Sequence, residues 1–169
     1  MNQDFIIKKL QANAETFKSL FAGLNKEEYL WKPQPEKWCL LEIACHLYDE
    51  EREDFKARLK HTLENPENKM PSIDPAGWVA SRKYIEQDFE KTVNNFLDER
   101  NNSLSWLYSL ENPNWKNTYQ HPKFGEFTAG MFLDNWLAHD YLHIRQITAT
   151  KYAFLKSHSK ERMDYAGEW

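Results

Sequence analysis

The sequence contains little glycine and little cysteine. Only 5 of its 169 residues are glycine, which excludes a turn-rich β-sandwich. The two cysteines, Cys39 and Cys45, lie six residues apart in a predicted helix. The helical rise between them is about 9 Å, which is too far for a disulfide. We therefore expect both thiols to be reduced and buried, as in a cytoplasmic protein.

Long apolar runs and an excess of positive charge are also absent. No stretch approaches the roughly 18 apolar residues of a membrane-spanning helix, and the start, MNQDFIIKKLQANAE, lacks the apolar core of a signal peptide. The formal net charge is −4, whereas nucleic-acid binders usually carry a basic surface. We expect a cytoplasmic protein that binds neither membranes nor nucleic acid.

Apolar residues recur every three or four positions in four long ranges, the pattern of helices with one buried face. Phe5 belongs to the first stripe and Ile85 to the third. Connections of about 8 to 18 residues are longer than usual, which leaves room for at least one overhand crossing in place of a simple up-down-up-down order. We predict an all-α four-helix bundle, one domain over residues 1–169, without strands. The predicted helices span residues 3–24, 39–65, 81–110 and 128 to about 150.

Two histidines, His139 and His143, lie four residues apart in the last predicted helix. At about 100° per residue, their side chains share one stripe with Phe132, Trp136 and Ile147. Side chains at this spacing meet on a helix face, so the two imidazoles can converge on one metal ion. They can also be packing residues, and the spacing alone leaves both interpretations open.

A third histidine is needed to complete a metal site. His46 lies in the second predicted helix, where Glu42, Asp49, Glu50 and Glu53 share its face. This acidic face predicts a position at the rim of a cleft rather than deep in a core. His46 can be read either as a metal ligand or as one residue of a solvated charged face, and both interpretations remain open. The other histidines lie near helix ends, where we expect surface positions, or in a loop: His61, His158 and His121.

Three imidazoles from two helices would give a cation three neutral nitrogen donors and leave it a further position. That layout is typical of a catalytic zinc-type site. Nickel, iron and cobalt also accept imidazoles, whereas calcium requires oxygen ligands. A di-iron bundle needs paired Glu-x-x-His motifs, which the sequence does not contain.

Three motifs occur in the order of a known family. WKPQPEKWCLLEIACHLYDEE, HPKFGEFT and HDYLHIRQI are similar to signatures of the bacterial DinB-like (DinB/YfiT) family, which is unrelated in fold to the DNA polymerase of that name. The resemblance extends from Trp31 to Ile147, with Cys39 where the family usually has serine. The matching positions are Trp31, Pro33, Pro35, Trp38, Glu42, Ile43, His46, Leu47, Asp49, His139, Asp140, His143, Gln146 and Ile147.

The resemblance implies a four-helix bundle of the DinB/YfiT type, often a homodimer, in which His46, His139 and His143 bind a divalent metal. Zinc or nickel is the expected ion, with iron, cobalt or manganese as alternatives. Some family members transfer a low-molecular-weight thiol such as bacillithiol to an electrophile, related mycothiol enzymes isomerise maleylpyruvate, and many have no known reaction.

The resemblance therefore favours a metal-dependent transferase that joins a low-molecular-weight thiol to an electrophilic small molecule. Glu42, Asp49 and Glu50 are candidate catalytic residues that could take the proton or hold an amine of the thiol. One alternative is a hydrolase of small esters or amides, because HDYLH is similar to the His-Glu-x-x-His of zinc proteases. Another is a non-enzymatic protein that binds a metal or small molecule, which a site sealed by aromatic rings would favour.

Overall fold

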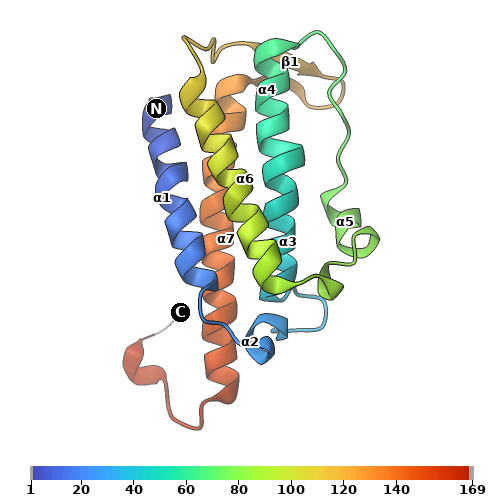
Figure 1. Cartoon of the computed structure of the whole chain (residues 1–169). Helices are drawn as coiled ribbons and strands as arrows, with labels where there is room; N and C mark the ends of the chain where they lie inside the picture. Colours follow the sequence, from blue (N-terminus) through green and yellow to red (C-terminus); the bar gives the residue numbers. More distant parts are fainter. Residues whose placement is uncertain (1, 168–169) are drawn as a thin grey trace.

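Four long helical rods pack side by side in the computed structural model, which describes residues 2–167 (Figure 1). The second rod contains two helices joined end to end, and the connections outside the rods carry only short elements. The rods are α1 (Gln3–Phe21), α3 (Leu40–Glu50) with α4 (Lys56–Glu64), α6 (Phe89–Ser109) and α7 (Ala129–His158). The prediction of an all-α four-helix bundle is confirmed.

The direction of the rods shows an overhand crossing. α3–α4 and α6 run parallel to each other, while α1 and α7 run the opposite way (Figure 1). The chain therefore returns along the outside of the bundle between α4 and α6, through α5 (Pro75–Ser81) and a 3-10 turn at Tyr84–Glu86. Trp78 and Tyr84 anchor this crossing segment in the core.

Two helices begin or end elsewhere than predicted. The first helix ends at Phe21, because Gly23 follows with a left-handed backbone at φ 70°. A short helix that was not predicted, α2 (Lys26–Leu30), comes next. α6 begins at Phe89 rather than near residue 81, since the Asp88 side chain caps it by accepting from the backbone N–H of Lys91. The predicted stripes were wrong at two positions that are nearly half exposed, Phe5 (46%) and Ile85 (48%).

The second rod is not the uninterrupted α-helix predicted over residues 39–65. A π-helical segment, Glu51–Phe55, separates α3 from α4. Such segments widen the helix locally and are frequent at functional sites. This one carries Glu51 into the middle of the bundle and Phe55 against α7.

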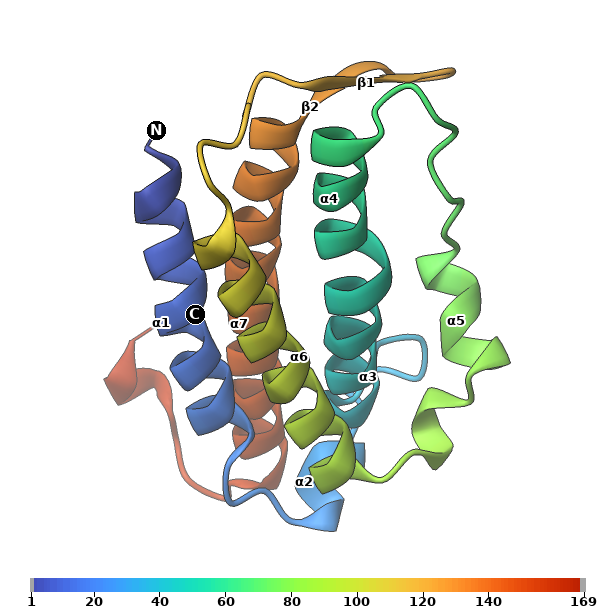
Figure 2. The same cartoon turned by 45° about the horizontal axis from the view of Figure 1, so that its top comes forward.

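The prediction of no strands is wrong. β1 (Thr118–His121) and β2 (Gly125–Thr128) form an antiparallel hairpin that lies across the ends of α4 and α7 (Figure 2). Gly125 takes φ 81° at the turn, where a left-handed residue suits a three-residue loop. β2 leads directly into α7, and the Thr128 side chain caps that helix by accepting from the N–H of Met131.

A polar layer divides the core into two apolar halves. One half lies toward α2 and α5, the other toward the hairpin. Each long rod contributes a buried polar side chain between them: Asn13, Glu51, Arg100 and Asp140. Among residues 2–167, no helix combines the length and apolar character needed to cross a membrane.

Candidate metal centre

Three histidines from two rods meet at the level of the polar layer. α3 contributes His46, and α7 contributes His139 and His143 one turn apart. The Nε2 atom of His139 lies 3.3 Å from Nε2 of His46 and 3.0 Å from Nε2 of His143. The ligand nitrogens of the three rings all lie within 4.8 Å of one another, so this group could hold a metal ion.

The three imidazoles are held in the neutral form. Burial lowers the pKa of His46 to about 3 and that of His139 to about 2, and repulsion from the neighbouring rings acts in the same direction. Burial also lowers the pKa of His143, although Gln146 and Asp140 oppose the shift. Metal ligands must be deprotonated, so each ring has a lone pair to offer at neutral pH.

The spacing of the ring nitrogens suits a cation. Zinc–nitrogen bonds of about 2.0–2.1 Å at a tetrahedral angle would place two ligand atoms about 3.3–3.4 Å apart. The separations of 3.0 and 3.3 Å at His139 are close to that value. The Nε2 atom of a neutral His139 has either one N–H or one lone pair, so it cannot form a separate hydrogen bond to each neighbour, whereas a cation would accept a lone pair from all three rings.

Aromatic rings flank the histidines. The ring centroids of Trp38 and His46 are 4.9 Å apart, and those of Phe55 and His139 are 4.8 Å apart. Both Trp38 and Phe55 are only partly buried. Trp136 is turned into the core, where its indole N–H donates to Glu51 over 3.0 Å. Trp136 therefore belongs to the polar layer and does not seal the site.

A buried arginine connects the rods behind the histidines. All five N–H donors of Arg100 are used: Nε and Nη2 bind Glu51, Nη1 and Nη2 bind Asp140, and Nη1 also reaches the carbonyl oxygen of Leu10. Asn13 donates to the same Asp140 carboxylate. Burial opposes the charge of Arg100, but the two carboxylates outweigh it and raise its pKa. This layer fixes the position of α7 relative to α3.

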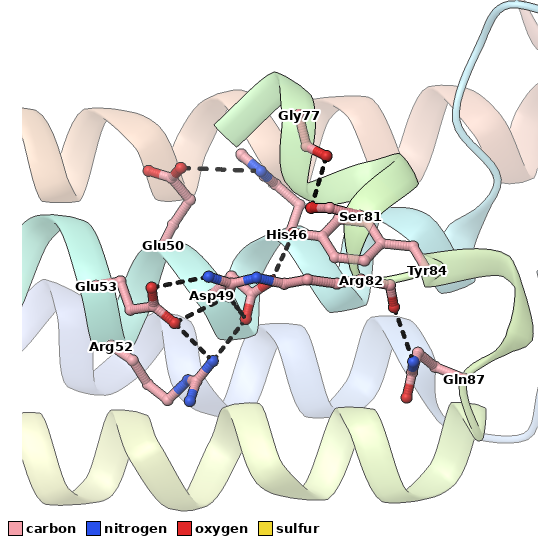
Figure 3. Close-up of polar contacts among 10 residues, drawn as sticks. All are labelled: His46, Asp49, Glu50, Arg52, Glu53, Gly77, Ser81, Arg82, Tyr84 and Gln87. Carbon is pink, nitrogen blue, oxygen red and sulfur yellow. Dashed lines mark hydrogen bonds and ion pairs between the residues drawn. The ribbon is translucent and has the colours of Figure 1, made fainter. Parts of the chain in front are cut away.

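Most of the acidic face predicted around His46 is not solvated; only Glu53 of its four acids stays partly exposed. Glu42, Asp49 and Glu50 are only 4–5% exposed, and His46 is itself buried rather than at a rim. The prediction overlooked that cations and backbone donors from other segments cover this face. The side chains of Asp49 and Glu50 leave the helix in different directions, and only Glu50 points at the His46 ring (Figure 3).

Two of these three acids are held by other groups. Glu42 accepts from the Cys39 backbone N–H over 2.9 Å, which caps α3, and pairs with Lys32 over 2.8 Å. One oxygen of Asp49 binds two cations, and its other oxygen accepts from the Tyr84 hydroxyl over 2.6 Å. Those cations, each 2.7 Å away, are Arg52 and Arg82, and the latter ties the crossing segment to α3.

Glu50 differs from the other two. Its Oε1 lies 4.0 Å from Nδ1 of His46, and each of these two buried atoms has no hydrogen-bond partner. Burial raises the pKa of Glu50 to about 9, and the hydrogen bond and charge of Asp54 act in the same direction. Glu50 is thus the predicted acid that the structure brings nearest to the candidate ligands.

The remaining histidines lie apart from the three. His61 contacts the backbone oxygen of Asn68, His121 accepts N–H groups in the hairpin turn, and His158 lies 3.6 Å from Glu27 near the end of α7. The surface position predicted for His158 is confirmed, whereas His61 is partly buried.

Sequence reasoning missed the polar layer, although a signal for it exists. Arg100 lies four residues from both Phe96 and Leu104, in phase with the buried stripe of α6. Asp140 is likewise in phase with Leu133 and Ile147 on α7. A charged side chain in phase with an apolar stripe becomes buried and needs a partner of opposite charge. Arg100 and Asp140 are such partners for each other.

The sequence matches the profile of the DinB superfamily over residues 9–147. Among solved structures, the chain resembles YfiT from Bacillus subtilis, described as a probable metal-dependent hydrolase with an unusual four-helix bundle topology. The TM-score is 0.79 at 17% identity, over 90% of this chain and 87% of YfiT. It also resembles TT2238, a four-helix bundle protein, with a TM-score of 0.56 at 15% identity over 88% and 99% of the two chains. At these identities the likeness shows the fold. Curated protein sequences give no significant match.

Proposed function

The chain belongs to the DinB superfamily, and we propose that it is a metal-dependent transferase that joins a low-molecular-weight thiol to an electrophilic small molecule. The observation that carries the proposal is the convergence of the Nε2 atoms of His46 and His143 on that of His139. Three neutral imidazoles are a ligand set that zinc and nickel accept. Iron, cobalt and manganese are alternative ions.

His46, His139 and His143 would hold the cation, because their lone pairs face one another at ligand spacing. When bound there, a divalent cation supplies Lewis acidity, which lowers the pKa of a thiol that reaches it. In the proposed reaction the thiol gives its proton to solvent water and its sulfur forms a bond to the electrophilic carbon. The bond that breaks is the carbon–chlorine bond, with chloride leaving, or an epoxide carbon–oxygen bond, whose oxygen stays attached and takes up a proton.

The surroundings of the three histidines favour a nucleophile that ionises without a strong neighbouring base. Arg100 and Asn13 hold Asp140, so this carboxylate is not free to accept a proton as the acid of a zinc protease does. The contacts of Glu42 and Asp49 support structural roles for both. A thiol has an ordinary pKa of about 8.5, against about 15.7 for water, and needs less help to ionise.

The test offers the purified, untagged protein a small thiol and a chlorinated or epoxide electrophile, with zinc or nickel added. We expect conjugation that requires the metal and is lost in His143→Ala. His158→Ala is the matched control, because this exposed histidine of the same helix lies apart from the three, and it should keep the activity. The absence of metal-dependent conjugation across a broad panel of thiols and electrophiles would refute the transferase.

Hydrolysis of small esters or amides is the second candidate, favoured by the likeness to YfiT, which is described as a probable metal-dependent hydrolase. The same protein is assayed with a panel of esters and amides without thiol. Metal-dependent hydrolysis that His143→Ala abolishes, together with no conjugation, would replace the transferase with a hydrolase. We further propose that the protein acts as a homodimer in the cytoplasm.

A further inference from the structure

Two buried polar atoms face each other behind the candidate metal centre without a partner. They are Nδ1 of His46 and Oε1 of Glu50, one helical turn apart on α3 and separated by 4.0 Å (Figure 3). Both residues are more than nine-tenths buried. A buried polar group without a hydrogen bond costs about 1–3 kcal/mol, so small side-chain rotations that bring these two atoms together are favoured.

The tautomer of neutral His46 determines whether its Nδ1 atom donates or accepts a hydrogen bond. A neutral imidazole carries one proton, and a ring that offers the Nε2 lone pair to a metal must carry that proton on Nδ1. The Nδ1–H group then needs an acceptor, and Glu50 Oε1 is the unpartnered acceptor beside it. Metal-ligating histidines commonly donate their second N–H to a carboxylate, which fixes the tautomer and the ring orientation.

Glu50 belongs to a row of ionisable side chains along the same rod. The carboxyl groups of Glu50 and Asp54 are neighbours that can share one proton, and Arg58 pairs with Asp54. His46, Glu50, Asp54 and Arg58 follow one another at four-residue intervals along this rod. A Glu50 carboxyl that shares its proton with Asp54 keeps the lone pairs of Oε1, the atom that lies 4.0 Å from Nδ1 of His46.

We infer that Glu50 is a positioning residue: it accepts the Nδ1–H of His46 and so fixes the tautomer that directs Nε2 toward His139 and His143. This inference rests on the proposed function, because it assigns Glu50 a role in the same metal centre. It gives Glu50 no contact with a substrate, since Oε1 lies on the Nδ1 side of the ring, away from the Nε2 atoms that converge.

The experiment measures zinc affinity by competition with a coloured chelator, for the untagged full chain. Glu50→Leu removes the acceptor and should weaken zinc binding about 10- to 100-fold, the usual effect of losing such a partner. Glu50→Gln keeps the shape of the side chain and one acceptor oxygen, so its zinc affinity should lie between those of the unchanged protein and Glu50→Leu. Glu64→Gln, an exposed acid at the end of the same rod, is the matched control and should bind zinc like the unchanged protein.

A second measurement separates positioning from general stability. Nitrogen NMR of the imidazole rings in metal-free protein should report His46 with its proton on Nδ1, and a shift toward the Nε2 tautomer in Glu50→Leu. If the unchanged protein binds no metal, the proposed function fails, while the tautomer still tests the inference. If zinc affinity and tautomer are the same with and without the Glu50 carboxyl, the inference is refuted and the metal centre stands.

Discussion

Replacing Arg100 with methionine should strongly destabilise the protein, because one guanidinium satisfies two buried carboxylates at once. It gives Glu51 bonds of 3.0 and 2.9 Å and Asp140 two bonds of 2.8 Å. Methionine fills much of the same space but donates nothing, so both carboxylates would remain in the core without their cation. Arg100→Met changes no other residue of the bundle, so the loss of stability would come from the two unpaired carboxylates.

The size of the effect follows from the cost of unpaired buried charge. Removing one partner of a buried ion pair costs about 3–5 kcal/mol, a large part of the roughly 5–15 kcal/mol by which proteins are stable. For a chain of this length that corresponds to a fall in melting temperature on the order of 10 °C. Arg100→Lys keeps the charge but loses the fork geometry that binds two carboxylates, so its cost should be smaller.

Urea denaturation of the metal-free protein, followed by circular dichroism, measures this free energy of unfolding. Arg162→Met is the control, because Arg162 pairs with Asp164 on the exposed surface, and it should leave the transition unchanged. The triple variant Glu51→Gln, Arg100→Met, Asp140→Asn removes all three charges together and should recover much of the loss. A loss below about 1 kcal/mol for Arg100→Met would contradict a structural role for the polar layer.

Three further predictions concern other parts of the bundle. Thr128→Ala removes the cap of α7 and should lower the free energy of unfolding by about 1 kcal/mol in urea denaturation; no loss would contradict the cap. Burial raises the pKa of Cys39 to about 11 and that of Cys45 to about 12. A thiol reagent at about pH 8 should therefore label both cysteines only when urea unfolds the protein. Rapid labelling of the folded protein would contradict their burial. Tyr84→Phe removes the 2.6 Å bond to Asp49 and should cost about 1.5–3 kcal/mol in urea denaturation, whereas an unchanged transition would show that this bond adds nothing.

The bundle could be predicted because its rods are long and each buries one face. α7 buries residues at three- and four-residue steps from Ala129 to Thr150, and α1 and α6 show the same spacing. The hairpin could not, because each strand has four residues and shows no alternation long enough to detect. The π-helical segment EREDF has no composition that sets it apart from an α-helix, since the packing of the rods decides it.

The candidate site could be predicted only in part. His139 and His143 lie on one helix, so their spacing alone brings their rings together. His46 lies 93 residues from His139 along the chain, and the family resemblance, not local periodicity, connected it with them. The position of Glu50 behind His46 depends on the rotation of α3 in the folded bundle. The sequence showed an acidic face but not which acid would reach the ring.

Metal content of untagged protein, prepared without chelators, tests the central claim most directly. After incubation with zinc or nickel and removal of the excess, we predict about one divalent ion per chain, as expected for one three-histidine site, and loss of this ion in His46→Ala while circular dichroism still reports the folded bundle. A protein that retains no divalent ion, or a His46→Ala variant that retains as much as the unchanged chain, would contradict the metal centre.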